Sequence, residues 1–240
     1  MFLFRIATYN IHKCVGLDRR FSPDRILKVL KMLDADIIGL QEVVAVNSND
    51  KRENQAQYFA DELGYNVCFG KNRLHNGSAY GNAILSRLEI GNFKNFDITI
   101  NKREPRGCLV AKLKTPNNRH LTFFNVHLGT SYFERRKQIH RLLNQNVMSY
   151  AMQNAPRIIA GDFNEWTKGL TTKLMKSNFY ALEPKQILGK RRTYPGIAPV
   201  LHLDHIYYDG AISLEKSYLK RNRTSLIASD HLPLVAEFLF

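Results

Sequence analysis

Short apolar runs recur along the whole chain, separated by polar and amphipathic stretches. Each run is rich in β-branched and aromatic residues and is bounded by turn-forming residues, which is typical of a buried strand. The pattern predicts strands at residues 2–9, 37–40, 79–86, 108–114, 120–128, 157–160, 203–208 and 233–240.

Apolar residues at helical spacing predict helices between these strands. The first begins with Ser22 as a capping hydroxyl and Pro23 at the first helical position, and the apolar residues between 26 and 33 form one face. The second ends at Gly64, a residue suited to a C-terminal cap. The third and longest is expected to run from Phe133 to Gln153.

Strands and helices are interleaved throughout, with hairpins in the middle and at the end, and no low-complexity linker divides the chain. This order argues against a simple doubly wound parallel sheet. It predicts the α/β (α+β) class, with two packed mixed sheets and helices on their outer faces. We expect a single domain over residues 1–240.

The net charge of +14 at pH 7 favours a polyanionic partner such as nucleic acid, anionic lipid or a phosphorylated small molecule. A generally solvated basic surface would give the same composition. The basic segments have aromatic residues near them, as in proteins that bind single-stranded nucleic acid, although each could be an ordinary solvated loop. These segments are Lys102-Arg103, Arg135-Arg136-Lys137, Lys190-Arg191-Arg192 and Lys220-Arg221-Asn222-Arg223.

Cysteine usage and the N-terminus indicate the compartment. Cys14, Cys68 and Cys108 are odd in number and scattered, which favours neither a disulfide framework nor a zinc site. The N-terminal segment lacks the features of a signal peptide, and no apolar run approaches the roughly 20 residues needed to span a bilayer. We therefore expect a cytoplasmic protein without a transmembrane segment.

Polar side chains with catalytic potential stand at the ends of predicted strands. Glu42 follows the run at 37–40, Asp162 and Asn164 follow the run at 157–160, and Asp230 and His231 precede the last run. Oxygen ligands and histidine without a thiolate cluster favour magnesium-assisted phosphoryl hydrolysis over a zinc site. Alternation would place Asp162 and Asn164 on one face.

Each of these residues also has a structural interpretation. Glu42 alone could be a solvated surface glutamate or a helix cap. The sequence Gly161-Asp162-Phe163-Asn164 is good turn chemistry, and both roles can hold together. A histidine such as His127 is, by itself, usually a partly buried residue whose ring is satisfied within the fold.

Six motifs in a single order along the chain favour the functional interpretation. The motifs are Thr8-Tyr9-Asn10, Leu40-Gln41-Glu42-Val43, Asn125-Val126-His127-Leu128, Gly161-Asp162-Phe163-Asn164, Leu203-Asp204-His205-Ile206 and Ser229-Asp230-His231-Leu232-Pro233. The set resembles the endonuclease/exonuclease/phosphatase superfamily, which includes pancreatic deoxyribonuclease, neutral sphingomyelinases and inositol polyphosphate phosphatases. The resemblance spans nearly the whole chain and implies a four-layer α/β/β/α sandwich with its active site at the rim between the sheets.

The resemblance assigns a metal site and a catalytic pair. Glu42 would be the main ligand of Mg²⁺, with Mn²⁺ as the alternative ion, and Asp230 and Asn10 would assist. Asp162 would orient or activate the attacking water. His231 would act as a base or electrostatic stabiliser, braced by Asp204 through a hydrogen bond that we expect to require adjacent strands.

The resemblance also suggests residues that contact phosphate. His127 is typical of the deoxyribonuclease, sphingomyelinase and phosphatase branches, where it contacts phosphate or the leaving group, and is generally absent from abasic-site endonucleases. Asn125 and Asn164 would bind phosphate. From its position before a strand, Arg106 could fork onto phosphate oxygens, or it could be a solvated arginine.

Three further histidines and one short signature have an open or a structural interpretation. His202, two residues before Asp204, is a candidate phosphate contact, whereas His12 and His205 are expected to be structural because neighbouring strand residues face opposite sides. The sequence Thr193-Tyr194-Pro195 resembles the Thr-aromatic-Pro signature of a small bacterial branch of the superfamily.

Three functions fit these observations. The first is a magnesium-dependent phosphodiesterase, most simply a nuclease, that acts as a monomer on nucleic acid by in-line attack of water. The second is the same chemistry on a phospholipid headgroup or an inositol phosphate, although no long amphipathic helix with bulky apolar residues suits interfacial docking. The third is a catalytically silent polyanion-binding protein, against which the intact set of motif residues argues.

Overall fold

A computed structural model of the chain describes residues 2–46, 50–151, 154–166, 169–182, 187–188, 192–196 and 198–240. The strands are β1 (Leu3–Asn10), β2 (Ile37–Ala45), β3 (Asn66–His75), β4 (Ser78–Ser86), β5 (Glu89–Asp97), β6 (Gly107–Lys114), β7 (His120–His127), β8 (Arg157–Asp162), β9 (Tyr180–Ala181), β10 (Ile187–Leu188), β11 (Asp204–Tyr208), β12 (Ser213–Leu219) and β13 (Leu234–Leu239). The helices are α1 (Pro23–Leu33), α2 (Gln55–Leu63), α3 (Tyr132–Leu142), α4 (Gln145–Met148), α5 (Leu170–Lys176) and α6 (Arg223–Ala228), with short 3₁₀ turns η1 (His12–Cys14) and η2 (Lys51–Glu53).

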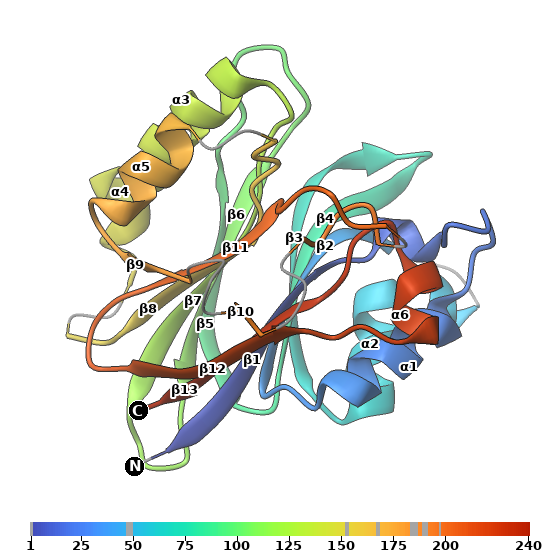
Figure 1. Ribbon diagram of the computed structural model, residues 1–240, viewed down its shortest axis with the longest axis horizontal. Helices are drawn as coiled ribbons and strands as arrows, with labels where there is room; N and C mark the ends of the chain where they lie inside the picture. Colours follow the sequence, from blue (N-terminus) through green and yellow to red (C-terminus); the bar gives the residue numbers. More distant parts are fainter. Residues whose placement is uncertain are drawn as a thin grey trace.

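The strands form two mixed sheets that lie against each other (Figure 1). The first sheet has the order β10-β12-β13-β1-β2-β4-β3, and the second has the order β5-β6-β7-β8-β11-β9. Strand β1 is parallel to β2 and antiparallel to β13, while β7 is parallel to β8 in the second sheet. The two chain ends meet at one end of the sandwich, where the backbones of Phe2 and Phe240 are hydrogen-bonded.

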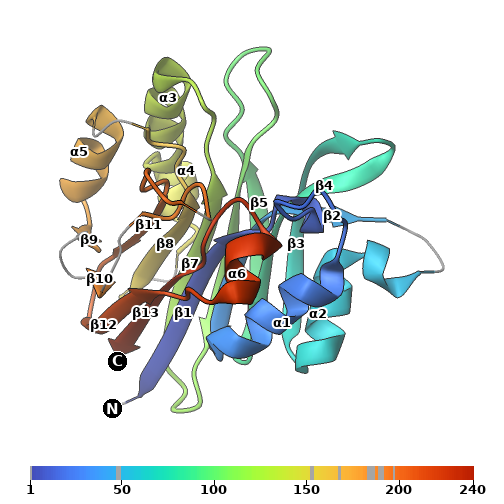
Figure 2. The same cartoon turned by 45° about the vertical axis from the view of Figure 1, so that its right-hand side comes forward.

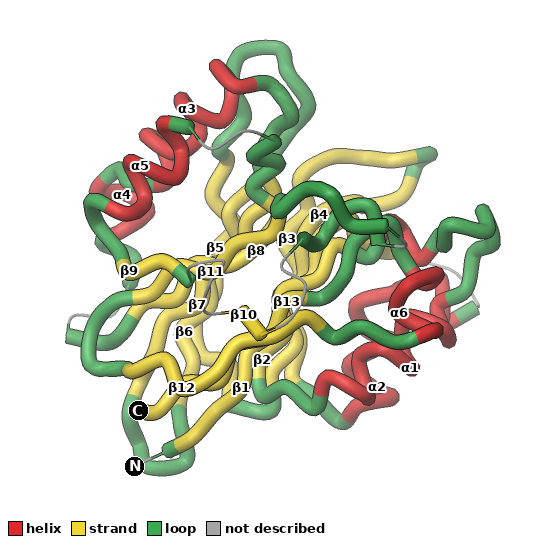
Figure 3. Tube along the Cα trace, in the orientation of Figure 1, coloured by secondary structure: helices red, strands yellow, loops and turns green. Residues whose placement is uncertain are grey.

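Helices cover the outer face of each sheet, which makes four layers. Figure 2 shows α1, α2 and α6 over the first sheet and α3, α4 and α5 over the second. In Figure 3 the strands lie between these two groups of helices. Three apolar clusters fill the spaces between the layers, one between the two sheets and one under each helical layer. The predicted four-layer α/β/β/α sandwich is confirmed. Among the described residues, none of the helices has the length and apolar character that a membrane crossing requires.

The alternation of side chains along β1 carries the polar end of the strand into the inter-sheet space. Phe4 and Ile6 pack in the cluster between the sheets, whereas Ala7 and Tyr9 pack under the helices. The same period of two places Thr8 and then Asn10 on the inter-sheet side. The apolar pattern that defines the core therefore also directs the last residue of β1 toward the facing sheet.

Three details differ from the sequence predictions. The long helix expected from Phe133 ends at Leu142, and a separate turn, α4, begins at Gln145 after Asn144 caps it through its side chain; the expected endpoint Gln153 lies outside the described residues. Ser22 makes no side-chain cap bond, and its carbonyl instead accepts from Arg25 N. The strand predicted to end at residue 40 continues to Ala45, as described below.

Candidate active site

A histidine and an aspartate connect the two sheets at the end of the sandwich opposite the chain termini. His231 Nδ1 lies 2.9 Å from Asp204 Oδ2, and both side chains are buried. Asp204 begins β11 in the second sheet, while His231 precedes β13 in the first. The predicted hydrogen bond is present, but the expectation that it requires adjacent strands is wrong, because the bond spans the gap between two sheets.

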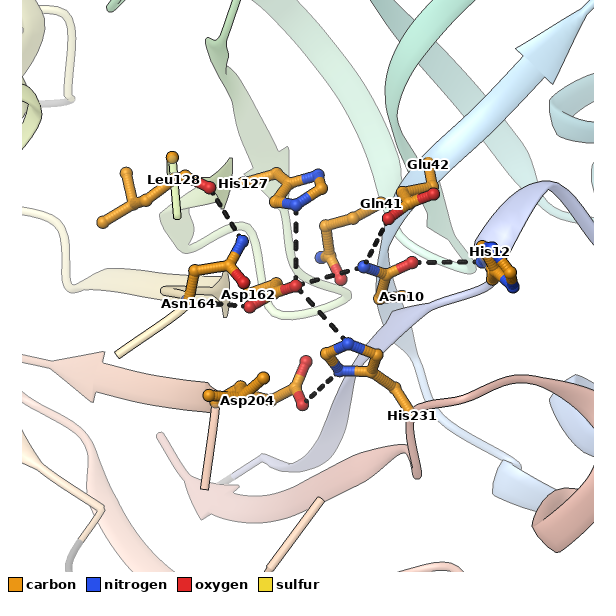
Figure 4. A network of polar contacts seen from close by, with 12 residues as sticks. Asn10, His12, Gln41, Glu42, His127, Leu128, Asp162, Asn164, Asp204 and His231 are labelled. Carbon is orange, nitrogen blue, oxygen red and sulfur yellow. Dashed lines mark hydrogen bonds and ion pairs between the residues drawn. The ribbon is translucent and has the colours of Figure 1, made fainter. Parts of the chain in front are cut away.

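Asp162 stands at the centre of the polar network in Figure 4. Its Oδ2 atom accepts a hydrogen bond from Asn10 Nδ2 at 3.1 Å, and it lies 3.5 Å from His127 Nε2 and 3.6 Å from His231 Nε2. Asp162 is the last residue of β8 and pairs with Asp204 across the sheet. The structure thus brings both histidines and Asn10 to one carboxylate.

Close packing of β7 and β8 explains the glycine before Asp162. Gly161 has φ 152°, and a Cβ atom there would lie 1.9 Å from the carbonyl oxygen of Val126. Only glycine fits this approach. Gly161 therefore lets β8 deliver Asp162 directly beside His127, its partner in the strand register.

Glu42 reaches the site through a β-bulge. In the pairing of β2 with β4, Leu40 is opposite Ala83 and Val43 is opposite Gly81, so β2 carries one extra residue. Glu42 occupies the bulge with φ 58°. Strict alternation would turn Glu42 toward the helical layer with Leu40, and the bulge redirects it toward Asn10. The sequence predicted Glu42 at a strand end, whereas it lies inside a longer strand.

A lysine holds the Glu42 carboxylate. Lys13 Nζ lies 2.7 Å from Glu42 Oε2, and Asn10 Nδ2 lies 3.1 Å from Glu42 Oε1. Burial opposes ionisation, but the charges of His127 and Lys13 and hydrogen bonds from Lys13 and Asn10 outweigh it and lower the pKa of Glu42. His127 is neutral at pH 7, so Lys13 is the charge that matters there. Lys13 was missed from the sequence, although it follows Asn10 closely.

His231 carries its proton at neutral pH. Burial alone would lower its pKa, but the carboxylates of Asp204 and Asp162 outweigh this effect and raise the pKa of His231 to about 10. Burial raises the pKa of Asp162, and the neighbouring charge of His231 acts in the opposite direction. The pair therefore presents an imidazolium next to a carboxylate of more than ordinary basicity.

Arg106 fixes the tautomer of His127. Arg106 Nη1 lies 2.8 Å from His127 Nδ1, and Arg106 Nη2 donates to Glu104 Oε2 at 3.0 Å. Burial, followed by the positive charge of Arg106, lowers the pKa of His127 to about 4. A guanidinium can only donate, so Nδ1 accepts and the ring proton is on Nε2, facing Asp162. Arg106 is only 7% exposed, so this placement supports a positioning role better than the predicted phosphate contact.

The side chains of Asn125 and Asn164 make hydrogen bonds within the protein. Asn125 is fully buried, donates to the carbonyls of Leu40 and Ala83, and accepts from Gln41 Nε2 at 2.7 Å. Its side chain connects the two sheets through these hydrogen bonds, so it is not placed as the phosphate ligand that we expected. Asn164, with φ 48°, donates from its backbone to Asp162 Oδ1 and from its side chain to a backbone carbonyl. It supports Asp162 in a turn, as one interpretation of the sequence predicted.

The Thr-aromatic-Pro signature supports the histidine–aspartate pair. Thr193 Oγ1 accepts from the backbone N–H groups of Leu203 and Asp204, at 3.2 and 3.4 Å. The Tyr194 ring lies 5.0 Å from the His231 ring, centroid to centroid. The sequence identified this signature without a role, and the structure places its first two residues against the two members of the pair.

Two groups of residues could hold a metal ion. The ligand atoms of Asp162, Asp204 and His231 lie within 4.8 Å of one another. Since Asp204 is already hydrogen-bonded to His231 Nδ1, we interpret this group as a proton-transfer set. Glu42 with Asn10 has the hard oxygen donors that Mg²⁺ prefers, and its carboxylate already binds a cation, the Lys13 ammonium. Asp230 is close by through Ser229, whose Oγ donates to Asn10 O at 2.7 Å and lies 3.2 Å from Asp230 Oδ1.

Comparison with known proteins agrees with this geometry. Residues 7–231 match the Endonuclease/Exonuclease/phosphatase family. The chain belongs to this family. Enzymes of the endonuclease/exonuclease/phosphatase family hydrolyse phosphoester bonds and usually use divalent metal ions.

Similar proteins match the chain over nearly its whole length. The chain is 29% identical to the uncharacterized protein YbhP of Escherichia coli (strain K12), over 98% of this chain and 96% of YbhP. A conserved protein of Enterococcus faecalis has the same fold with a TM-score of 0.82 at 20% identity, over 98% of this chain and 99% of that one. A mannosyl-6-phosphatase of Bacteroides thetaiotaomicron has a TM-score of 0.78 at 18% identity, over 99% and 100% of the two chains.

The basic segments differ in how much of them reaches the surface. Arg135 is 3% exposed, and its guanidinium donates to the carbonyls of Gly129 and Thr130, so it is not a surface cation. Arg136 and Arg192 are exposed, whereas Arg191 lies outside the described residues. Arg135 is therefore not positioned to meet a polyanion, whereas Arg136 and Arg192, and both members of the run Lys102-Arg103, are exposed.

Of the three further histidines considered in the sequence, His205 is structural as expected, His12 lies nearer the site than expected, and His202 packs on His205 and not beside Asp204 as the predicted phosphate contact would. His12 Nδ1 lies 3.1 Å from Val15 O and 3.9 Å from Asp230 Oδ1, at the edge of the site. His202 packs against the His205 ring at 4.6 Å, centroid to centroid, which places it beside the outer face of β11. His205 is buried between Phe163 and Tyr207, as a structural residue would be.

Replacing His205 by phenylalanine should make the protein less sensitive to acid. Burial, then the charge of His202, lowers the pKa of His205 far below 6.5, so only the unfolded chain takes up this proton as the pH falls below 6.5. Protonation of the unfolded chain below that value therefore lowers the stability of the wild type, by at most about 1.4 kcal/mol for each pH unit. We expect similar thermal stability in wild type and variant near neutral pH and a more stable variant near pH 5. Melting curves that shift equally with pH would contradict this expectation.

Proposed function

We propose that the protein is a divalent-metal-dependent phosphodiesterase that hydrolyses nucleic acid by in-line attack of water on phosphorus. The observation that carries the proposal is the position of Asp162, shared by Asn10, His127 and His231 at the end of the sandwich. Hydrolysis of a phosphodiester needs an oriented water and neutralisation of the charge that builds on phosphate. This network supplies groups for both.

Each residue has a task that follows from its protonation state. Asp162, a carboxylate made more basic by burial, orients the water and takes up its proton. His231, held as an imidazolium by Asp204, neutralises the phosphate oxygens in the transition state. His127 presents Nε2–H as a neutral donor toward the phosphate or the leaving oxygen. Arg106 and Tyr194 position the two imidazoles.

Metal binding would use the more accessible edge of the network. The Glu42 and Asp230 side chains are 18% and 26% exposed, unlike the buried Asp162. Glu42 would hold the ion, with Asn10 and Asp230 beside it, after Lys13 moves from the carboxylate. The ion would supply Lewis-acid neutralisation of charge at the phosphate.

Two other functions remain alternatives with defined tests. A phospholipid headgroup, an inositol phosphate or a sugar phosphate could meet the same network, and one structure with this fold is a mannosyl-6-phosphatase. A silent polyanion-binding protein would keep the fold and lose the chemistry. The retained histidine–aspartate pair, with its 2.9 Å contact, favours an enzyme.

A substrate panel tests the proposal. Single- and double-stranded DNA, RNA, phospholipid vesicles, inositol phosphates and mannose 6-phosphate are each incubated with Mg²⁺ or with excess chelator. We expect magnesium-dependent cleavage of nucleic acid. Hydrolysis of only lipid, inositol or sugar substrates would replace the nuclease assignment, and no hydrolysis of any substrate would support the silent alternative.

The exposed cations should make nucleic-acid binding sensitive to salt. Each phosphate contact contributes roughly −0.7 to −0.9 to the slope of log affinity against log salt, because released counterions favour binding. We expect Arg136→Gln and Arg192→Gln to flatten that slope by about one contact each. Arg135→Gln should instead lower thermal stability, since its buried guanidinium bonds two carbonyls. Fluorescence anisotropy of labelled oligonucleotides at several salt concentrations measures the slope, and strong binding to anionic vesicles with a flat salt profile on nucleic acid would favour the lipid alternative.

A further inference from the structure

Two aromatic rings continue outward from the catalytic histidine. The Tyr194 ring packs on His231, and the Trp166 ring lies 6.2 Å from Tyr194, centroid to centroid, at an interplanar angle of 57°. Tyr194 is half-buried, whereas Trp166 is 51% exposed. The contacts of His231 with Tyr194 and of Tyr194 with Trp166 therefore connect the buried imidazole to the protein surface.

Both rings come from segments that already hold catalytic residues. Trp166 N donates to Asn164 O at 3.1 Å, and Asn164 in turn supports Asp162. Tyr194 follows Thr193, which binds the backbone of Asp204. The same hydrogen bonds that support Asp162 and Asp204 therefore also position the two rings relative to the reacting groups.

Positive charge borders the exposed ring. Trp166 lines a cavity of about 380 Å³ together with Arg192 and Lys176. Glu165 also lines the cavity, but its carboxylate is buried and accepts hydrogen bonds from Gly169 N, Thr172 N and the Thr172 hydroxyl. The Trp166 indole therefore packs near the Tyr194 ring and also lines a cavity that contains two cations, a combination that suits a flat apolar group attached to phosphates.

We infer that Trp166 and Tyr194 form a stacking platform for an unpaired nucleobase next to the phosphodiester that is cleaved. This inference rests on the proposed function, because it names the substrate of the same site. An exposed aromatic ring beside cations is how proteins hold single-stranded nucleic acid, and each stacked base contributes about 1–3 kcal/mol. A base in a duplex has both faces covered by its neighbours. The platform therefore selects single-stranded or frayed nucleic acid.

Trp166 is the chain's single tryptophan, so its emission reports directly on the platform. The wild-type protein, with excess chelator to prevent turnover, is titrated with a single-stranded oligodeoxynucleotide, an abasic oligomer of equal length and charge, the matching duplex, and mannose 6-phosphate. We expect the single strand to change the emission at lower concentration than the abasic oligomer or the duplex. Equal responses to the base-bearing and abasic oligomers would overturn the inference, and so would a response to the sugar phosphate alone.

Turnover gives a second, independent measurement. We expect Trp166→Ala to lower the ratio of kcat/KM for the base-bearing strand to that for the abasic oligomer by about five- to 100-fold. Trp166→Phe should restore most of the ratio. Phe93→Ala is the matched control, because Phe93 is 49% exposed on β5 and takes no part in the network. An unchanged ratio in Trp166→Ala would overturn the inference.

The emission titration and the turnover measurement together also separate this inference from the proposed function. If neither oligomer is cleaved with Mg²⁺, the proposed function fails, while the emission titration still decides whether a base stacks on Trp166. If both oligomers are cleaved with the same kcat/KM and quench equally, the nuclease stands and the platform is wrong.

Discussion

His231→Ala should lower kcat on a single-stranded oligonucleotide by about 10²-fold or more, the effect expected when a transition-state-stabilising or acid–base group is removed. The variant loses the imidazolium that Asp204 and Asp162 hold in its charged form. Asp204→Asn should also impair turnover, because an amide is a poor partner for the imidazolium and can select the wrong tautomer. Turnover at saturating substrate is the measurement.

Stability must be separated from chemistry in this experiment. His231→Ala leaves the Asp204 carboxylate buried without its partner, which costs about 1–3 kcal/mol or more. The double variant Asp204→Asn with His231→Ala should regain part of this loss and remain inactive. Circular dichroism and thermal melts establish folding for each protein. Near-normal turnover in both single variants would remove the pair from the mechanism.

Glu42→Gln should abolish most of the magnesium-dependent activity. Gln keeps the size of the side chain but loses the charge that Lys13 now neutralises and that an ion would need. Charge neutralisation by a metal ion contributes several kcal/mol, so we expect kcat/KM to fall on the order of 10²- to 10³-fold at a fixed magnesium concentration. Activity against magnesium and manganese concentration measures the effect, with calorimetric titration of the ion.

The control for this variant is Glu62→Gln, since Glu62 forms only an exposed pair with Lys31. Its activity should match that of the wild type. Chelator should remove wild-type activity, and Mg²⁺ or Mn²⁺ should restore it better than Zn²⁺, because the candidate ligands are oxygens. Full activity in excess chelator, or unchanged ion affinity in Glu42→Gln, would remove Glu42 from the metal site.

The alternation of apolar and polar residues explains where β1, β7, β8 and β11 place their last or first polar side chain. Asn10, His127, Asp162 and Asp204 share a face with inter-sheet core residues two or four positions away. A period of two is a local property, so it can be read from the sequence. That these strand ends meet at one site was predicted from the family resemblance and not from the alternation.

Other parts of the site depend on contacts that no local pattern contains. The bulge at Glu42 depends on how β2 pairs with β4, and the sequence alone predicted that this strand ends at residue 40. From the sequence, Arg135 belongs to a basic segment that could bind a polyanion. In the structure its guanidinium is buried in α3 against the carbonyls of Gly129 and Thr130. Tyr194 could be recognised as part of a signature, but its contact with His231 joins residues far apart in the chain.

The bond between Asp204 and His231 joins the two sheets, and the network around it draws on residues from Asn10 to His231. No fragment that stops before His231 can hold an active pair, whatever secondary structure it has formed. The last essential side chain therefore follows nearly all of the sandwich in the chain, so during synthesis the pair can form only after most of both sheets has been made.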